Sequence, residues 1–198
     1  QRVINPRDVD LTEAKRIVRY IKGTRNLKLN LSVKEPKEIL TAYSDSDWGE
    51  DKADRKSNSG FVCLMYGGAV SWCCKKQKVV ALSSTEAEYV ALTETCKEVV
   101  WLKRLAQELD IVIPETVTIK TDNQSCLAMI YNPASSGRTK HVDVKYHFIK
   151  DQVTTKAVRL EYVSTEMNVA DLLTKPLGGL RTANLCEMVG LPNKLMDK

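Results

Sequence analysis

The stretch ILTAYSDSDW, residues 39–48, is the best guide to the fold of this protein. The run from Ile39 to Tyr43 alternates with the period of two that is typical of a β-strand. Two aspartates, Asp45 and Asp47, follow it two residues apart. A strand that ends in acidic residues either turns into solvent or delivers a carboxylate to a site.

The composition is that of a globular protein with one domain, or one domain and an appendage. The chain has 198 residues, of which 43% are hydrophobic and 28% charged, which is enough to bury a core. It has no apolar run near the ~18 residues of a membrane span and no signal-peptide pattern at its amino terminus. Its first residue is Gln1 rather than Met, so we expect a piece of a longer protein.

The six cysteines and two histidines argue against a zinc site. No pair of cysteines has C-x-x-C spacing, so free thiols in a reducing compartment are the preferred interpretation over disulfides. The net charge of +5 is modest and is weak evidence for a nucleic-acid partner.

Hydrophobic periodicity predicts the order of helices and strands. An amphipathic helix at 10–22, with a possible capping box of Asp10 and Glu13, precedes a strand ending at Asp45. Further strands are expected at 61–66, 69–74, 117–122 and 157–163, and helices at 84–109, 123–131, 141–153 and 168–175. Gly67 and Gly68 predict a hairpin, and the tail after Pro176 is expected to be poorly ordered or partner-dependent. The fold class is therefore a mixed α/β layer.

Acidic residues recur where these elements begin or end: Asp45 after the first strand, Asp122 after the fourth and Asp171 in the last helix, with a glutamate in the long helix. Each has an ordinary explanation, because Asp122 or Asn123 could cap a helix and Asp171 suits a helix dipole. However, ligand sites in α/β sheets gather beyond the carboxyl ends of strands.

Four carboxylates in one place raise each other's pKa unless cations compensate them. A set of oxygen ligands without histidine or cysteine favours Mg²⁺ or Mn²⁺ over zinc. The chemistry that this predicts is phosphodiester hydrolysis assisted by paired metal ions.

Several longer motifs, in this order, resemble the ribonuclease H domain of copia-like LTR-retrotransposon Pol polyproteins: AYSDSDW, SGFV, SWCCKKQKVVALSSTEAEYVAL, TDNQS, TKHVDVKYHFI and NVADLLTKPL. The resemblance covers residues 37–178. Residues 1–36 resemble the end of the reverse transcriptase of the same polyprotein, and residues 179–198 form a C-terminal tail.

The resemblance implies a ribonuclease H-like fold: a five-stranded mixed sheet, three antiparallel strands followed by two parallel ones, flanked by helices. It implies an endoribonuclease that cleaves the RNA strand of RNA–DNA hybrids with two Mg²⁺ ions, for which Mn²⁺ substitutes. The partners it implies are the hybrid and the adjacent reverse transcriptase, with no membrane, in cytoplasmic virus-like particles.

Carried over residue by residue, the family's catalytic and metal-binding carboxylates fall on Asp45, Glu88, Asp122 and Asp171. Helical spacing separately favours Glu88 over Glu86, because Glu88 lies on the face that packs on the sheet. Glu86 instead completes a capping box with Ser83. Asp47 is either an outer neighbour of the metals or a solvated residue.

Substrate contacts are also expected. Asn123 and Gln124 could face the ribose 2′-hydroxyl, which distinguishes RNA from DNA. Basic residues beside two of the helices could hold phosphates, with ordinary surface positions as the equal alternative: Lys75, Lys76, Lys78, Arg138 and Lys140.

The sequence departs from cellular ribonucleases H in two places. The chain between Asp122 and residue 140 is too short for their extra basic helix, and the loop STEMNVA has no histidine. These departures support a second hypothesis, a catalytically weak module that tethers hybrid to an adjacent reverse transcriptase. A DDE-type integrase is disfavoured, because here the glutamate is the second acid and lies on a helix.

Overall fold

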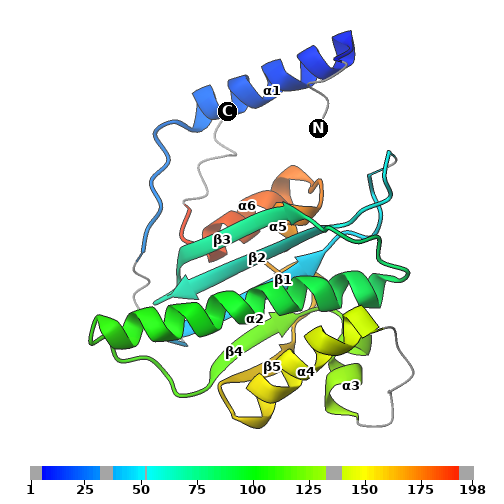
Figure 1. Ribbon diagram of the computed structural model, residues 1–198. Helices are drawn as coiled ribbons and strands as arrows, with labels where there is room; N and C mark the ends of the chain where they lie inside the picture. The colour runs from blue at the N-terminus through cyan, green and yellow to red at the C-terminus, as the bar shows by residue number, and fades with distance from the viewer. Residues whose placement is uncertain (1–5, 32–37, 52, 133–139, 192–198) are drawn as a thin grey trace.

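The computed structural model describes residues 6–31, 38–51, 53–132 and 140–191. Its centre is one five-stranded sheet in the order β3-β2-β1-β4-β5 (Figure 1). The strands are β1 Leu40–Ser46, β2 Asn58–Met65, β3 Gly68–Lys76, β4 Val117–Thr121 and β5 Val158–Tyr162. The first three pair antiparallel, and β4 and β5 run parallel to β1. The predicted ribonuclease H-like sheet is confirmed.

Helices cover both faces of this sheet (Figure 1). The long α2, with α3 and α4, packs on one face, and α5 and α6 pack on the other. The bounds are α1 Asp8–Thr24, α2 Ser84–Glu108, α3 Gln124–Tyr131, α4 Lys140–Thr154, a 3₁₀ turn η1 Thr165–Met167, α5 Asp171–Thr174 and α6 Gly179–Met188. Within the described residues, no helix has the length and apolar character needed to cross a bilayer.

The central strand β1 contributes to two cores because its side chains alternate between the faces. Leu40 and Ala42 join the core beneath α2, whereas Tyr43 joins the core beneath α5 and α6. All seven residues of β1 are buried. Charge is costly in a strand buried on both faces, so Asp45, the residue before the last in β1, needs a compensating environment.

The first hairpin is displaced slightly from its predicted position. Met65 pairs with Gly68, so the two-residue turn is Tyr66–Gly67 rather than Gly67–Gly68. Both turn residues have positive φ angles, 51° and 81°, as a type I′ hairpin turn requires. The strand β2 also begins three residues before its predicted start.

The tail was predicted to be poorly ordered or partner-dependent, and the first alternative is wrong for residues 179–188, which form α6. Leu185 of α6 is fully buried against the second face of the sheet, and Val189 accepts a hydrogen bond from Ala69 of β3. Without α6, Val62 on this face of β2 would lose its apolar cover. The division of the chain at residues 36 and 178 stays a prediction.

The helix α1 stands apart from the sheet (Figure 1). It has no buried residue, and Val18 of its apolar stripe is 65% exposed. The predicted capping box with Glu13 is wrong, because the helix begins at Asp8. Asp10 is its third residue and accepts a hydrogen bond from the backbone N–H of Arg7 at 2.9 Å.

Candidate metal centre

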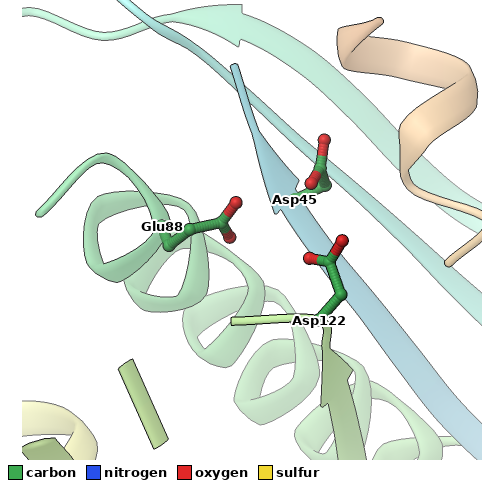
Figure 2. Close-up of side chains that lie close together, drawn as sticks. All are labelled: Asp45, Glu88 and Asp122. Carbon is green, nitrogen blue, oxygen red and sulfur yellow. The ribbon is translucent and has the colours of Figure 1, made fainter. Parts of the chain in front are cut away.

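Three carboxylates from distant parts of the chain meet at one edge of the sheet (Figure 2). Asp45 lies in β1, Glu88 in the first turns of α2, and Asp122 directly after β4. One carboxylate oxygen of each lies within 4.8 Å of the others. Because β1 and β4 are parallel neighbours, their carboxyl ends reach the same edge, and this brings the two aspartates together.

The start of α2 separates the roles of its two glutamates. Ser83 caps the helix by accepting the backbone N–H of Glu86 at 3.1 Å, and the Glu86 carboxylate accepts the N–H of Leu82 at 2.8 Å. Glu88, two residues further, points to the other side of the helix, towards the sheet, and is 6% exposed. The prediction that Glu86 caps the helix and Glu88 points inward is confirmed.

The Glu88 carboxylate is only half satisfied. One oxygen accepts the backbone N–H of Ser46 at 3.2 Å. The other oxygen is buried and has no hydrogen-bond partner among the described residues. An unpaired buried carboxylate oxygen costs free energy, so this atom indicates that a ligand belongs here.

The electrostatics of the triad favour a bound cation. Burial raises the pKa of Glu88 well above its usual range, and the charges of Asp45 and Asp122 raise it further. Burial likewise raises the pKa of Asp45 to about 7, assisted by the charge of Asp171 and opposed by a hydrogen bond from Thr174. A divalent cation would remove this penalty, because it binds the ionised carboxylates. The residues therefore fit Mg²⁺ or Mn²⁺.

Asp122 is oriented by two residues that the sequence did not single out. The Thr165 hydroxyl donates to one of its oxygens at 2.7 Å, and the Asn168 amide lies 3.4 Å from the other. The same amide donates to the backbone carbonyl of Ser44 in β1 at 3.0 Å. Asn168 therefore joins the segment before α5 to both strands that carry the aspartates.

Asp171 lies beside the triad, but its partners are two cationic side chains. It is fully buried, and its carboxylate is ion-paired with Lys175 at 2.8 Å and with Arg181 of α6. The Lys175 ammonium also contacts Asp45 at 2.9 Å, so it bridges the two aspartates. Burial opposes the charge on Lys175, yet its hydrogen bond to Asp171 and the charge of Asp45 prevail and raise its pKa above its usual value.

The close approach of α5 to the sheet makes this bridge possible. Gly60 of β2 pairs with Asp45 across the antiparallel ladder. A Cβ atom on Gly60 would lie 2.7 Å from the Thr174 side chain and 3.1 Å from that of Leu173. Only glycine leaves α5 this near to β1, where the Thr174 hydroxyl donates to Asp45.

Asp47 does not belong to the triad. It is 3% exposed, and its carboxylate accepts the backbone N–H of Asn58 at 2.9 Å and the side-chain amide of Asn58 at 2.6 Å. These bonds fix the start of β2, which explains why that strand begins earlier than predicted. Of the two alternatives for Asp47, the structure excludes a solvated side chain.

The predicted substrate contacts are spread over several elements. Asn123 caps α3 by accepting the backbone N–H of Cys126 at 2.8 Å, and Gln124 beside it is exposed. Lys75 and Lys78 are exposed, whereas Lys76 is held by Asp51 at 2.5 Å and Asp54 at 2.7 Å. Arg138 and the side chain of Lys140 lie outside the described residues.

Comparisons with known proteins agree with this fold. The chain is 41% identical over 187 residues to the retrovirus-related Pol polyprotein from transposon TNT 1-94 of Nicotiana tabacum, a match that covers 94% of this chain and 14% of that protein. It is 39% identical over 186 residues to the retrovirus-related Pol polyprotein from transposon RE1 of Arabidopsis thaliana, covering 94% of this chain and 13% of that protein. No protein-family model matches the chain.

Among solved structures, the chain is similar to LC11-RNase H1 in complex with RNA/DNA hybrid, with a TM-score of 0.50 and 14% identity. That match covers 68% of this chain and 93% of LC11-RNase H1. The fold and the buried acidic triad thus define a ribonuclease H-like domain. The chain belongs to the copia-type retrotransposon Pol polyproteins, and it spans about one seventh of the length of the curated relatives it matches.

Proposed function

We propose that this chain is an endoribonuclease that cleaves the RNA strand of RNA–DNA hybrids during retrotransposon reverse transcription. The observation that carries the proposal is the buried triad in which one Glu88 oxygen has no partner among the described residues. A fold with no use for divalent cations would have no reason to keep such a costly group. The hybrid bound to the similar LC11-RNase H1 supports the choice of substrate.

In this proposal Asp45, Glu88, Asp122 and Asp171 hold two Mg²⁺ ions, which Mn²⁺ can replace. When bound, such ions supply the positive charge that polarises the phosphate and activates water. Asp45 belongs to the triad and also shares Lys175 with Asp171, so it would be the residue able to contribute to both ions. Thr165 and Asn168 hold the Asp122 carboxylate in place.

The proposal also assigns substrate contacts to residues near the triad and beside the helices. Gln124 is exposed beside Asp122 and can face a ribose hydroxyl, whereas Asn123 already uses its amide oxygen as a helix cap. Lys75 and Lys78 are exposed and available to phosphates. Lys76 is engaged by two aspartates and is the weaker candidate. We retain Lys140 and Arg138 as phosphate contacts on the sequence pattern alone.

The test is incubation of the purified chain with RNA–DNA hybrid, double-stranded RNA or double-stranded DNA, each carrying a labelled strand. We expect cleavage of the RNA strand of the hybrid alone, with Mg²⁺ or Mn²⁺, leaving 5′-phosphate and 3′-hydroxyl ends. EDTA should abolish it. Undiminished cleavage in EDTA, or equal attack on duplex DNA, would refute the proposal.

A second candidate function is supported by the environment of Asp171. Because Lys175 and Arg181 already neutralise this carboxylate, the chain could bind hybrid and cleave it poorly. It would then tether substrate to the reverse transcriptase of the same polyprotein, inside cytoplasmic virus-like particles. Hybrid binding in EDTA, without cleavage when Mg²⁺ is restored, is the result that would favour this candidate.

A further inference from the structure

The two carboxylates bridged by Lys175 have no free oxygen. The Lys175 ammonium donates a hydrogen bond to one oxygen of Asp45 at 2.9 Å and to one oxygen of Asp171 at 2.8 Å. The Thr174 hydroxyl donates to the second oxygen of Asp45, and the Arg181 guanidinium donates to the second oxygen of Asp171. On the other side of Asp45, one Glu88 oxygen has no partner in the described structure. The acidic cluster therefore has two sides. On the filled side, Asp171 is paired with Lys175 and Arg181. On the open side, Glu88 and Asp122 form the triad with Asp45.

The charges divide in the same way. With all four carboxylates ionised, as metal binding requires, they face two cations, Lys175 and Arg181, that ion-pair with them in the part of the chain described. Two negative charges are left over, which is the charge of one divalent cation. The open triad of Asp45, Glu88 and Asp122 is where these charges gather.

A divalent cation between Asp45 and Asp171 would compete directly with Lys175. It needs the same carboxylate lone pairs, and two cations a few ångströms apart repel each other. Lys175 can leave, because its side chain is 30% exposed and sits on a flexible four-carbon stem. Arg181 has no such freedom, since it also donates to the backbone carbonyl of Thr165.

We propose that Lys175 occupies a second cation position, between Asp45 and Asp171, and controls how many metal ions the centre holds. The resting protein takes one divalent cation, at the triad. A second one binds only when the Lys175 side chain swings away. This inference rests on the proposed function in one respect, that the triad binds a divalent cation.

The experiment is a Mn²⁺ titration of the purified full chain, with free Mn²⁺ followed by electron paramagnetic resonance and total binding by calorimetry. We expect the wild type to bind one ion, and a second at least about tenfold more weakly. Lys175→Met should bind two ions with similar affinity. The matched control is Lys120→Met, because Lys120 is equally half-buried and pairs with Glu38, outside the cluster. It should bind like the wild type.

The possible failures are distinguishable. If Lys175→Met binds the same number of ions as the wild type with the same affinities, the role of Lys175 is refuted and the metal centre stands. If the wild type binds no ion, the metal centre and the proposed function are refuted together.

A second measurement, on the wild type, covers the case in which Lys175→Met does not fold. The rate at which acetic anhydride acetylates Lys175 is followed by mass spectrometry at rising Mn²⁺, with Lys120 as internal reference. We expect the rate for Lys175 to rise severalfold at the Mn²⁺ concentrations at which the second ion binds, while that for Lys120 stays constant. A rate for Lys175 that is unchanged or falls would refute its displacement.

Discussion

The two sides of the acidic cluster differ although both are built from buried carboxylates. On the Asp171 side, Lys175 and Arg181 supply two cations within hydrogen-bonding distance. On the open side, Glu88 accepts one backbone N–H and keeps one oxygen unpaired, and the described residues that contact Asp122 are the neutral side chains of Thr165 and Asn168. Asp45 lies between them and belongs to both.

This difference shows that burial alone does not decide what a carboxylate contributes. A buried aspartate with two cationic partners is already compensated in the metal-free protein, so removing one of those partners destabilises the fold. A buried glutamate without such partners lowers that stability and is useful only when a cation binds. The predictions below test whether the two sides behave in these opposite ways.

The largest expected effect is on the open side, in Asp122→Asn. The change keeps the shape of the side chain and removes a charge that a metal ion needs. We expect cleavage of RNA–DNA hybrid to fall by about 10²–10³-fold, the order seen when one transition-state stabilising group is lost. Initial rates with labelled hybrid, with circular dichroism as the folding control, are the measurement. A cleavage rate within a few-fold of that of the wild type would refute the assignment of Asp122 as a metal-binding residue.

On the filled side, Arg181→Met leaves Asp171 with Lys175 as its ion-pair partner. We expect the free energy of unfolding to fall by about 2–3 kcal/mol, because a buried carboxylate loses a charged partner. Urea unfolding at pH 7 in EDTA measures this, and Arg104→Met, at an exposed position of α2, is the control. An unfolding free energy equal to that of the control would mean that α6 does not stabilise Asp171.

Glu88→Gln should change the free energy of unfolding in the opposite direction to Arg181→Met. The folded pKa of Glu88 is raised, so the folded state holds its proton more tightly than the unfolded state does. Its contribution to stability is therefore fully present below the unfolded pKa, near 4.3, and is lost as pH rises through the folded pKa. Glutamine does not titrate, so the metal-free variant should be more stable than wild type at pH 8 and equal to it near pH 4.

Thermal or urea unfolding in EDTA across pH 4–8 follows this difference, and hybrid cleavage should be abolished in the same variant. A variant less stable than wild type at pH 8 would show that Glu88 has a stabilising partner and would remove the contrast between the two sides.

The smallest effect is expected at Glu86, which lies near the open side but outside it. Glu86→Ala removes the hydrogen bond to the N–H of Leu82 and leaves the triad intact. The unfolding free energy should fall by about 0.5–1 kcal/mol, as for a weakened cap, with unchanged cleavage. A paired melt and cleavage assay alongside Glu88→Gln is the measurement. A folded but inactive Glu86→Ala would reverse the assignment of the two glutamates.

Much of the open side could be predicted from sequence, because it depends on local signals. The alternation before Asp45 predicts a strand, and parallel strands place Asp45 and Asp122 at one edge of the sheet. Helical spacing and the capping box separate Glu88 from Glu86 within a few residues of chain. The alternation and capping signals act over one strand or one turn, so neighbouring residues reveal them, whereas the parallel strands were expected from the resemblance to the ribonuclease H family.

The filled side was decided by tertiary structure. Lys175 contacts Asp45 across 130 residues of sequence, and Arg181 lies on a helix that was expected to be a loose tail. Nothing in the spacing of the sequence predicts these contacts, because they depend on α5 packing closely against Gly60 and on α6 covering the second face. The sequence by itself determined which carboxylates meet. The packing of α5 and α6 decided which of them are already neutralised, since that depends on distances between segments far apart in the chain.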